Sequence, residues 1–171
     1  MRPVVAVTLV LALSQAGLNG PVSLGGSWVP DPSVSERSKE LKAPDPRAPP
    51  APPAPPAGAP KLRPLRIAHD GPTIVFEVVG EEGSPLSSER ITTDGQEHVS
   101  ARGGGELTHV SLSRWDGASL RTEWRLTQAG ADIMTGVDVW SLADDRASLI
   151  HTSSMEDSKS HSTAKTVYRR K

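Results

Sequence analysis

The histidines are the side chains of this sequence best suited to acid–base or metal chemistry. They are His69, His98, His109, His151 and His161. No two of them are spaced i, i+2 or i, i+4, and no cluster of carboxylates completes a metal-ligand pattern. We therefore expect no metal site and interpret these residues as surface or hydrogen-bonded histidines. His151, which lies between Ile150 and Thr152, is the one that could point into the interior.

The other polar motifs predict no catalytic site. Two pairs of adjacent carboxylates, Glu81-Glu82 and Glu156-Asp157, fall in expected loops, where neighbouring side chains point apart into water. The run Gly103-Gly104-Gly105 precedes no helix and lacks the Lys-Ser/Thr of a phosphate-binding loop. Gly-x-Ser-x-Gly is absent. We expect a protein that is not an enzyme and needs no cofactor. An enzyme would require a cluster at one end of the fold, assembled from Glu97, His98, His109 or Asp132.

Composition narrows the classes of function further. The chain has no cysteine, which excludes disulfides, thiolate catalysis, cysteine zinc sites and a lipid-modified cysteine anchor. The net charge of −1 gives no general preference for nucleic acid or for an acidic membrane. The basic end, Tyr168 to Lys171, is interpreted as a solvated terminus.

The elements that position these residues are short strands with alternating polarity. Between them lie turn signals, among them Asp70-Gly71, Asp94-Gly95, Asp116-Gly117, Gln128-Ala129-Gly130 and Asp144-Asp145. Asp-Gly supplies the positive φ angles that tight hairpins need, so the pattern predicts an antiparallel meander. The expected strands are Leu65–His69, Thr73–Val79, Leu86–Thr92, Glu97–Ala101, Thr108–Trp115, Ser119–Leu126, Ile133–Trp140, Ser148–Ser153 and Ser162–Tyr168.

Closure of these strands into an up-and-down β-barrel is the most economical arrangement, because closure removes both sheet edges. Two packed sheets are the alternative. The clearest alternation sets Leu120, Thr122, Trp124 and Leu126 against Arg121, Glu123, Arg125 and Thr127. The strand 133–140 stays ambiguous: both of its faces are covered, or a bulge at Gly136 changes its phase.

We expect residues 65–171 to form the main domain. The chain before residue 65 divides into three segments. Residues 1–16 resemble a secretory signal peptide, with Arg2, an apolar run from Val4 to Leu13, and cleavage expected near Ala16/Gly17. Residues 17–42 hold a first strand over 26–30, stopped by Pro30 and Pro32, and a short helical turn over 33–42. Residues 43–64 are Pro-rich and expected to be disordered. We expect export to the periplasm or the exterior, with no transmembrane segment after cleavage.

Several motifs together resemble the lipocalin group, and in particular exported, lipocalin-like bacterial proteins of unknown function. They are Gly26-Ser27-Trp28, Ile91-Thr92-Thr93-Asp94-Gly95, Ser113-Arg114-Trp115-Asp116-Gly117, Val139-Trp140-Ser141-Leu142 and Val167-Tyr168-Arg169. The resemblance implies a barrel and an export route. It also implies that a basic residue near the end, Arg169 or Arg170, packs on the ring of Trp28 by a cation–π contact.

From this interpretation we expect non-catalytic binding of a small apolar or amphipathic ligand inside the barrel. The candidate ligand-binding residues are Thr122, Trp124, Thr135, Trp140 and His151. Each tryptophan could instead fill the core, and Trp28 most of all. The alternative is a filled barrel that binds a protein partner through its surface or its Pro-rich arm.

Overall fold

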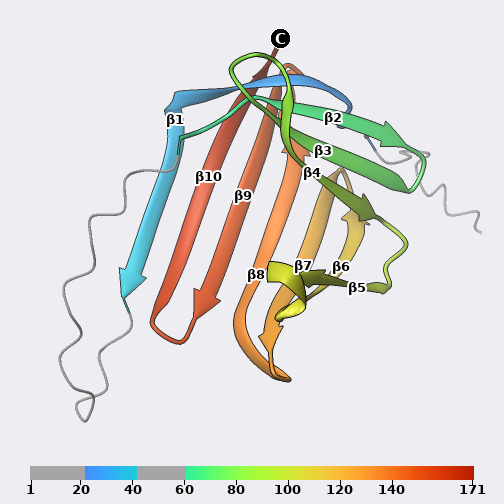
Figure 1. The fold of residues 1–171 in the computed structure, drawn as a ribbon. Helices are drawn as coiled ribbons and strands as arrows, with labels where there is room; N and C mark the ends of the chain where they lie inside the picture. Colours follow the sequence, from blue (N-terminus) through green and yellow to red (C-terminus); the bar gives the residue numbers. More distant parts are fainter. Residues whose placement is uncertain (1–21, 42–60) are drawn as a thin grey trace, which may run out of the picture.

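The computed structural model describes residues 22–41 and 61–171, which form one antiparallel sheet of ten strands (Figure 1). The only helical element in this part of the chain is a 3-10 turn, η1, at Gly103–Gly105. The strands are β1 (Gly26–Leu41), β2 (Leu65–Asp70), β3 (Thr73–Val79), β4 (Pro85–Thr92), β5 (Glu97–Arg102), β6 (Leu107–Asp116), β7 (Ser119–Gln128), β8 (Ala131–Leu142), β9 (Ser148–Asp157) and β10 (Ser160–Arg170).

The nine strands predicted between residues 65 and 168 are all present, with small differences at their ends. Alternating polarity and the turn residues explain this agreement. At the β6–β7 hairpin, for example, Gly117 has a φ of 59°, a conformation that favours glycine. The prediction of an all-β antiparallel fold is confirmed.

The strand order is β4-β3-β2-β1-β10-β9-β8-β7-β6-β5. Every pair of strands consecutive in sequence except β4 and β5 is therefore adjacent in the sheet, and β1 pairs with β10, as in an up-and-down barrel. The ring differs from the expected closed barrel at one place, because no ladder joins β4 to β5. The sheet is strongly curled, and β2–β4 cross its concave face (Figure 1). We call the opposite side of the sheet the outer face.

The first strand is longer than expected, and the helical turn predicted over 33–42 is wrong. β1 continues to Leu41 by pairing Glu36–Leu41 with β10. A register shift after Asp31 leaves Pro32 outside the ladder, so the proline does not end the strand. Across this shift the Ser35 hydroxyl accepts from the Val167 N–H at 3.2 Å and donates to the Asp31 carbonyl at 2.7 Å. The exposed edge of β10 offers more hydrogen bonds than a helix anchored by two apolar residues would gain.

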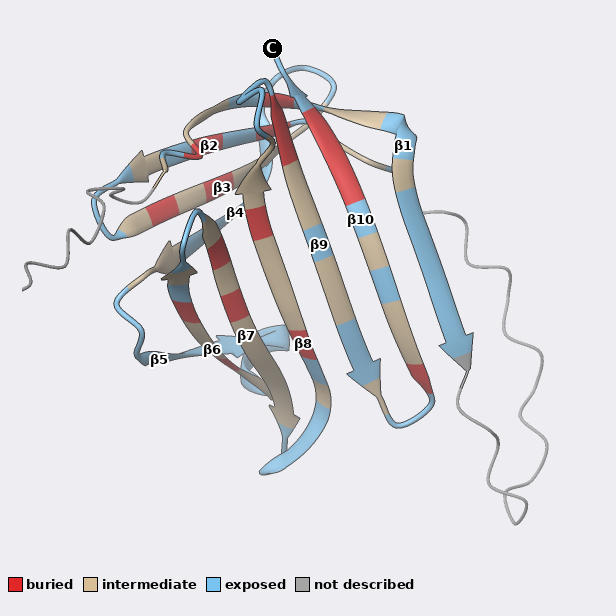
Figure 2. Cartoon of the chain, turned by 180° about the vertical axis from the view of Figure 1, so that it is seen from behind, coloured by how far each residue is buried: buried red, intermediate tan, exposed pale blue. Residues whose placement is uncertain are grey.

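The hydrophobic core lies where β2 and β3 cross the upper half of the other strands. Ring contacts join the two layers, with the Phe76 and Trp140 centroids 4.7 Å apart. Figure 2 shows most of the buried residues of β2, β3, β8, β9 and β10 at this end of the sheet. The core cluster consists of Leu24, Trp28, Leu65, Ile67, Ile74, Phe76, Leu120, Trp140, Leu149 and Tyr168.

The ambiguous strand 133–140 now has an orientation. Trp140 faces the core, whereas Val137 and Val139 line a hollow on the outer face. No register shift occurs at Gly136; the shift lies between Leu126 and Thr127, where Ile133 is the extra residue of β8.

One end of the core is closed by Trp28, whose side chain is fully buried. The Arg170 guanidinium lies over its ring, 4.5 Å from the centroid, and the indole N–H donates to the Leu24 carbonyl at 3.1 Å. A Cβ at Gly26 would lie 2.9 Å from Arg170 Nη1, so glycine at this position leaves room for the guanidinium. Of the two basic residues that the resemblance implied, Arg170 makes this contact. Arg169 instead donates to Ser148 Oγ at 2.7 Å and pairs with Asp31.

Two sequence predictions, the signal peptide and most of the Pro-rich segment, concern residues outside the described ones, which exclude 1–21 and 42–60. Within residues 22–41 and 61–171, no helix has the length and hydropathy required to cross a membrane.

The Trp28–Arg170 contact makes a prediction about stability. Arg170→Ala removes the cation over the ring and should lower the free energy of unfolding by about 0.5–2 kcal/mol. Arg170→Lys keeps a cation and should lose less. Urea denaturation of the two variants and the unchanged protein measures the difference. Equal stability of all three would show that the contact contributes nothing.

Candidate functional site

Three of the five predicted ligand-binding residues lie together on the concave face, joined by a residue that was not predicted. His151 Nε2 lies 2.7 Å from Asp138 Oδ1. The Trp124 indole N–H donates to the other carboxylate oxygen, Oδ2, also at 2.7 Å. Trp140 stacks on His151, with ring centroids 3.8 Å apart and planes inclined by 7°. We call Trp124, Asp138, Trp140 and His151 the concave-face cluster.

The register of three adjacent strands produces this cluster. Trp124 on β7 lies opposite Gly136 on β8, and Trp140 on β8 lies opposite His151 on β9. Directly paired residues share a face, so all these side chains point inward. A Cβ at position 136 would lie 2.3 Å from the Trp124 ring. Glycine there lets the indole lie against the backbone of β8, within reach of Asp138.

The cluster lies at the edge of the core on the concave face. Trp140, only 9% exposed, contacts Phe76 in the core as well as His151. The side chains of His151 and Asp138 remain 21% and 24% exposed. The site therefore has a rigid apolar base and a polar surface that solvent can reach.

Asp138 is held in its ionised form. Burial acts to raise its pKa, but the hydrogen bond and charge of His151 and the hydrogen bond from Trp124 outweigh burial and lower the pKa below its usual value. At neutral pH the concave face thus presents a carboxylate in a half-buried setting. Its two oxygens accept hydrogen bonds from His151, Trp124 and Ser153, and two carboxylate oxygens have about four acceptor sites in all.

A second histidine lies beside the cluster. The His109 ring on β6 is 6.0 Å from the Trp124 ring. Burial lowers its pKa, and the charge of Arg102 lowers it further. His109 is therefore a neutral imidazole at pH 7, able to donate or accept a hydrogen bond without adding charge.

The remaining two predicted residues do not join the cluster. Thr122 is buried on the inward face of β7, and its hydroxyl lies 2.9 Å from the Ser113 hydroxyl. Thr135 is on the outer face, where it lines a hollow of ≈ 470 Å³ together with Arg121 and Glu123.

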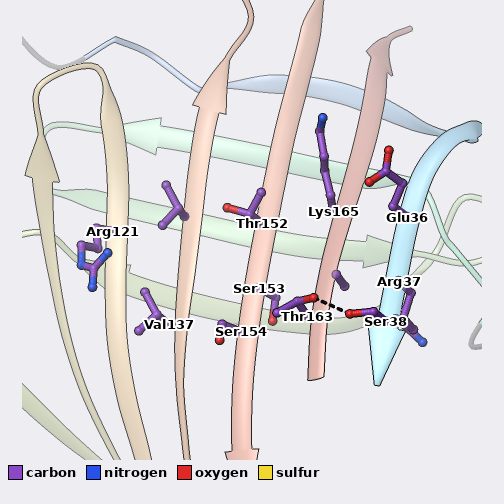
Figure 3. A pocket seen from close by; sticks show the side chains of 12 residues that line it. Glu36, Arg37, Ser38, Arg121, Val137, Thr152, Ser153, Ser154, Thr163 and Lys165 are labelled. Atoms are coloured by element: carbon purple, nitrogen blue, oxygen red, sulfur yellow. Dashed lines mark hydrogen bonds between the residues drawn. The ribbon is translucent and has the colours of Figure 1, made fainter. Parts of the chain in front are cut away.

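The outer face also carries a larger hollow, of ≈ 600 Å³, across β1 and β7–β10 (Figure 3). Its lining combines the apolar side chains of Val137, Val139 and Ala164 with polar ones, and the Ser38 and Thr163 hydroxyls lie 2.8 Å apart within it. Lys165 and Glu36 lie at its upper side in this view. Neither hollow contains a residue of the core cluster. Trp124 and Gly136 also contribute to the lining of the smaller hollow, so only β7 and β8 separate it from the concave-face cluster.

Of the residues that an enzyme would require by the sequence analysis, His98 and Glu97 make separate contacts. His98 bonds to Asp94 at 2.9 Å, and Glu97 pairs with Arg125 at 2.8 Å. Consecutive residues of a strand point to opposite faces, so His98 and Glu97 are on different sides of β5. Among the described residues, no group of three or more His, Asp or Glu side chains is placed to hold a metal ion.

Asp138 is the residue that sequence reasoning missed, although a signal for it exists. It stands between Val137 and Val139 in an apolar strand, two positions from Trp140. A carboxylate on a partly buried face needs a partner. The partners are on neighbouring strands, and only the strand register identifies them as His151 and Trp124.

The lowered pKa of Asp138 predicts a difference in pH dependence. Its folded-state pKa is below the unfolded value, so its stabilisation is complete above the unfolded pKa, about 3.9, and is lost as pH falls through the folded pKa. Asp138→Asn should lower the free energy of unfolding by about 1–3 kcal/mol at pH 7. The difference in the free energy of unfolding between this variant and the unchanged protein should disappear in acid.

Urea denaturation of the two proteins at a series of pH values measures this difference in stability. Asp132→Asn is the matched control, because Asp132 lies on the same strand with an exposed side chain. If the difference in stability between Asp138→Asn and the unchanged protein is the same at the lowest pH, the assignment of an ionised carboxylate is contradicted.

The concave-face cluster combines aromatic surface, an ionised carboxylate and imidazole nitrogen atoms at the edge of a rigid core. Such a site can bury an apolar group and orient a polar one by hydrogen bonding. Comparison with known proteins found no family model and no curated protein that matches the chain.

Proposed function

We propose that the protein binds a small apolar or amphipathic molecule on its concave face, without catalysis. The observation that carries this proposal is the partly exposed cluster of Asp138, His151 and Trp124 at the boundary of the core. Polar side chains that serve stability alone would be expected either fully buried in the core or fully exposed to water. Here the polar atoms are fixed by short hydrogen bonds and are still partly exposed.

Apolar surface beside the cluster supports the same proposal. Leu126 and Met134 are paired across β7 and β8 on the inward face, and both are partly exposed. Met155 lies opposite Gly136 on the same face and is 39% exposed. Flexible methionine side chains adapt to ligands of different shape. The apolar part of a ligand would contact these side chains and Trp124, and its polar part would bond to Asp138 or His151.

The proposal includes a lipocalin-like barrel that stays open between β4 and β5, and export to the periplasm or exterior. The strand order, cyclic except between β4 and β5, and the Arg170–Trp28 contact support the first part. The sequence of residues 1–16 supports the second. The intact mass of the chain purified from its native host tests export: a mature chain beginning at Gly17 is expected, and an uncleaved mass would contradict it.

Binding is tested with N-phenyl-1-naphthylamine, an apolar amine whose fluorescence rises in apolar surroundings. The unchanged protein should bind it, and Trp124→Leu should weaken binding about ten-fold, because losing the indole removes roughly 1–2 kcal/mol of contact energy. Titrations are run far below the unfolding temperature of both proteins, so that binding and stability are separated.

Thr135→Val is the matched control, since Thr135 lies on β8 but lines the outer hollow. It should leave the affinity unchanged. Absence of binding by the unchanged protein would overturn the proposal. If Thr135→Val weakens binding and Trp124→Leu does not, the ligand occupies the outer face and the concave-face assignment is wrong.

A further inference from the structure

We propose that ligands enter the concave face through the gap between β4 and β5, and that the ion pair between Glu89 and Arg102 holds this gap closed. We call this gap, between Pro85–Thr92 and Glu97–Arg102, the seam. The inference rests on the proposed function, because it describes access to the same site.

The seam is the one interruption in the cyclic order of the described strands. Every residue of β5 is exposed, as are the first six residues of β4. Each of the two strands has one unpaired edge, and the contact between Glu89 and Arg102 places β4 and β5 near each other. A ligand can pass between them without breaking any backbone ladder, whereas every other route through the sheet would break one.

The ion pair crosses the seam on the inner side. Glu89 on β4 lies opposite Phe76, a core residue, and so points inward. Arg102 is two residues after Ser100 and so lies on the same face of β5. Ser100 lies opposite His109, which points inward, so Arg102 points inward as well. Arg102 Nη2 lies 3.2 Å from Glu89 Oε1. The contact thus joins two strands that share no ladder.

The ion pair lies next to the concave-face cluster. The charges of both Arg102 and Glu89 act on His109, and Arg102 contributes to its lowered pKa. The His109 ring is 6.0 Å from Trp124, which bonds to Asp138. A short series of contacts therefore leads from the seam to the proposed ligand site.

The surroundings of β5 oppose its movement only weakly. β5 pairs with β6 alone, and none of its residues is buried. It ends at Gly103–Gly105, where the backbone φ angles are 57°, 72° and 101°. Strands with few buried contacts open locally at low cost. The side chains of Arg102 and Glu89 are 50% and 52% exposed, so their attraction is modest and screened by salt.

An entrance held by an ion pair has a kinetic signature. Weakening the pair should accelerate both association and dissociation and leave the dissociation constant unchanged. Stopped-flow mixing with N-phenyl-1-naphthylamine measures both rates. We expect Glu89→Gln and Arg102→Gln each to raise both rates about two- to five-fold, the range for an exposed ion pair. The exchanged pair, E89R with R102E, should restore the slow rates.

Glu77→Gln is the matched control. Arg66 and Glu77 form an ion pair of the same length, 3.2 Å, between β2 and β3, away from the seam. This variant should not change the rates. Raising the ionic strength should accelerate exchange in the unchanged protein and much less in Glu89→Gln.

A covalent closure provides a second measurement that does not depend on charge. Because the chain has no cysteine, E89C with R102C can be joined selectively by a flexible bis-maleimide. The cross-link should slow probe entry at least ten-fold, whereas N-ethylmaleimide on the same variant should not. If the unchanged protein binds the probe but neither the charge variants nor the cross-link alter its rates, the entrance is elsewhere. If the unchanged protein does not bind, the proposed function fails instead.

Discussion

The pairing of β1 with β10 is the constraint on which the rest of the structure depends. It joins the beginning of the described chain to its end, and through β1 the ladder continues into β2, β3 and β4. Without this ladder, no backbone pairing would join β2, β3 and β4 to the rest of the sheet and hold them across the concave face. The pairing therefore brings Phe76 against Trp140 and closes the core. Trp28 and Arg170, opposite each other in the β1–β10 ladder, fix its register at the end of the core.

Trp140 connects the stability of the fold to the proposed function. One side of its ring contacts the core and the other stacks on His151. His151 in turn bonds to Asp138, so the orientation of the polar groups depends on core packing. This arrangement preorganises the site, which reduces the entropy lost when a ligand binds. Outside this cluster, the concave face carries partly exposed apolar side chains such as Met155.

The strands after residue 65 could be predicted because each carries its own evidence: alternation such as Leu120 to Leu126, and a turn at each end. β1 could not, because its second half is held by the edge of β10, about 125 residues away in the chain. The open seam depends on how the sheet curls, which no local pattern records. Trp124 and His151 were identified by residue type and predicted direction. Asp138 depended on register, and Thr135 was misplaced because the phase of β8 was ambiguous until Trp140 was seen to face the core.

The length of β1 sets a minimum for the chain that follows it. β1 pairs with β2 only at Gly26–Trp28, yet it ends at Leu41, at the opposite end of the sheet (Figure 1). Lys61 lies back beside Trp28, where the two line one hollow of ≈ 300 Å³. This stretch of β1 runs beside Ser160–Arg170 of β10, so at about 3.3 Å per residue the return distance is roughly 33 Å. Residues 42–60 can span roughly 65 Å when fully extended, so deletion of about half of them would already strain the β1–β2 connection. The length of this segment is therefore a geometric requirement of the topology, whatever its composition.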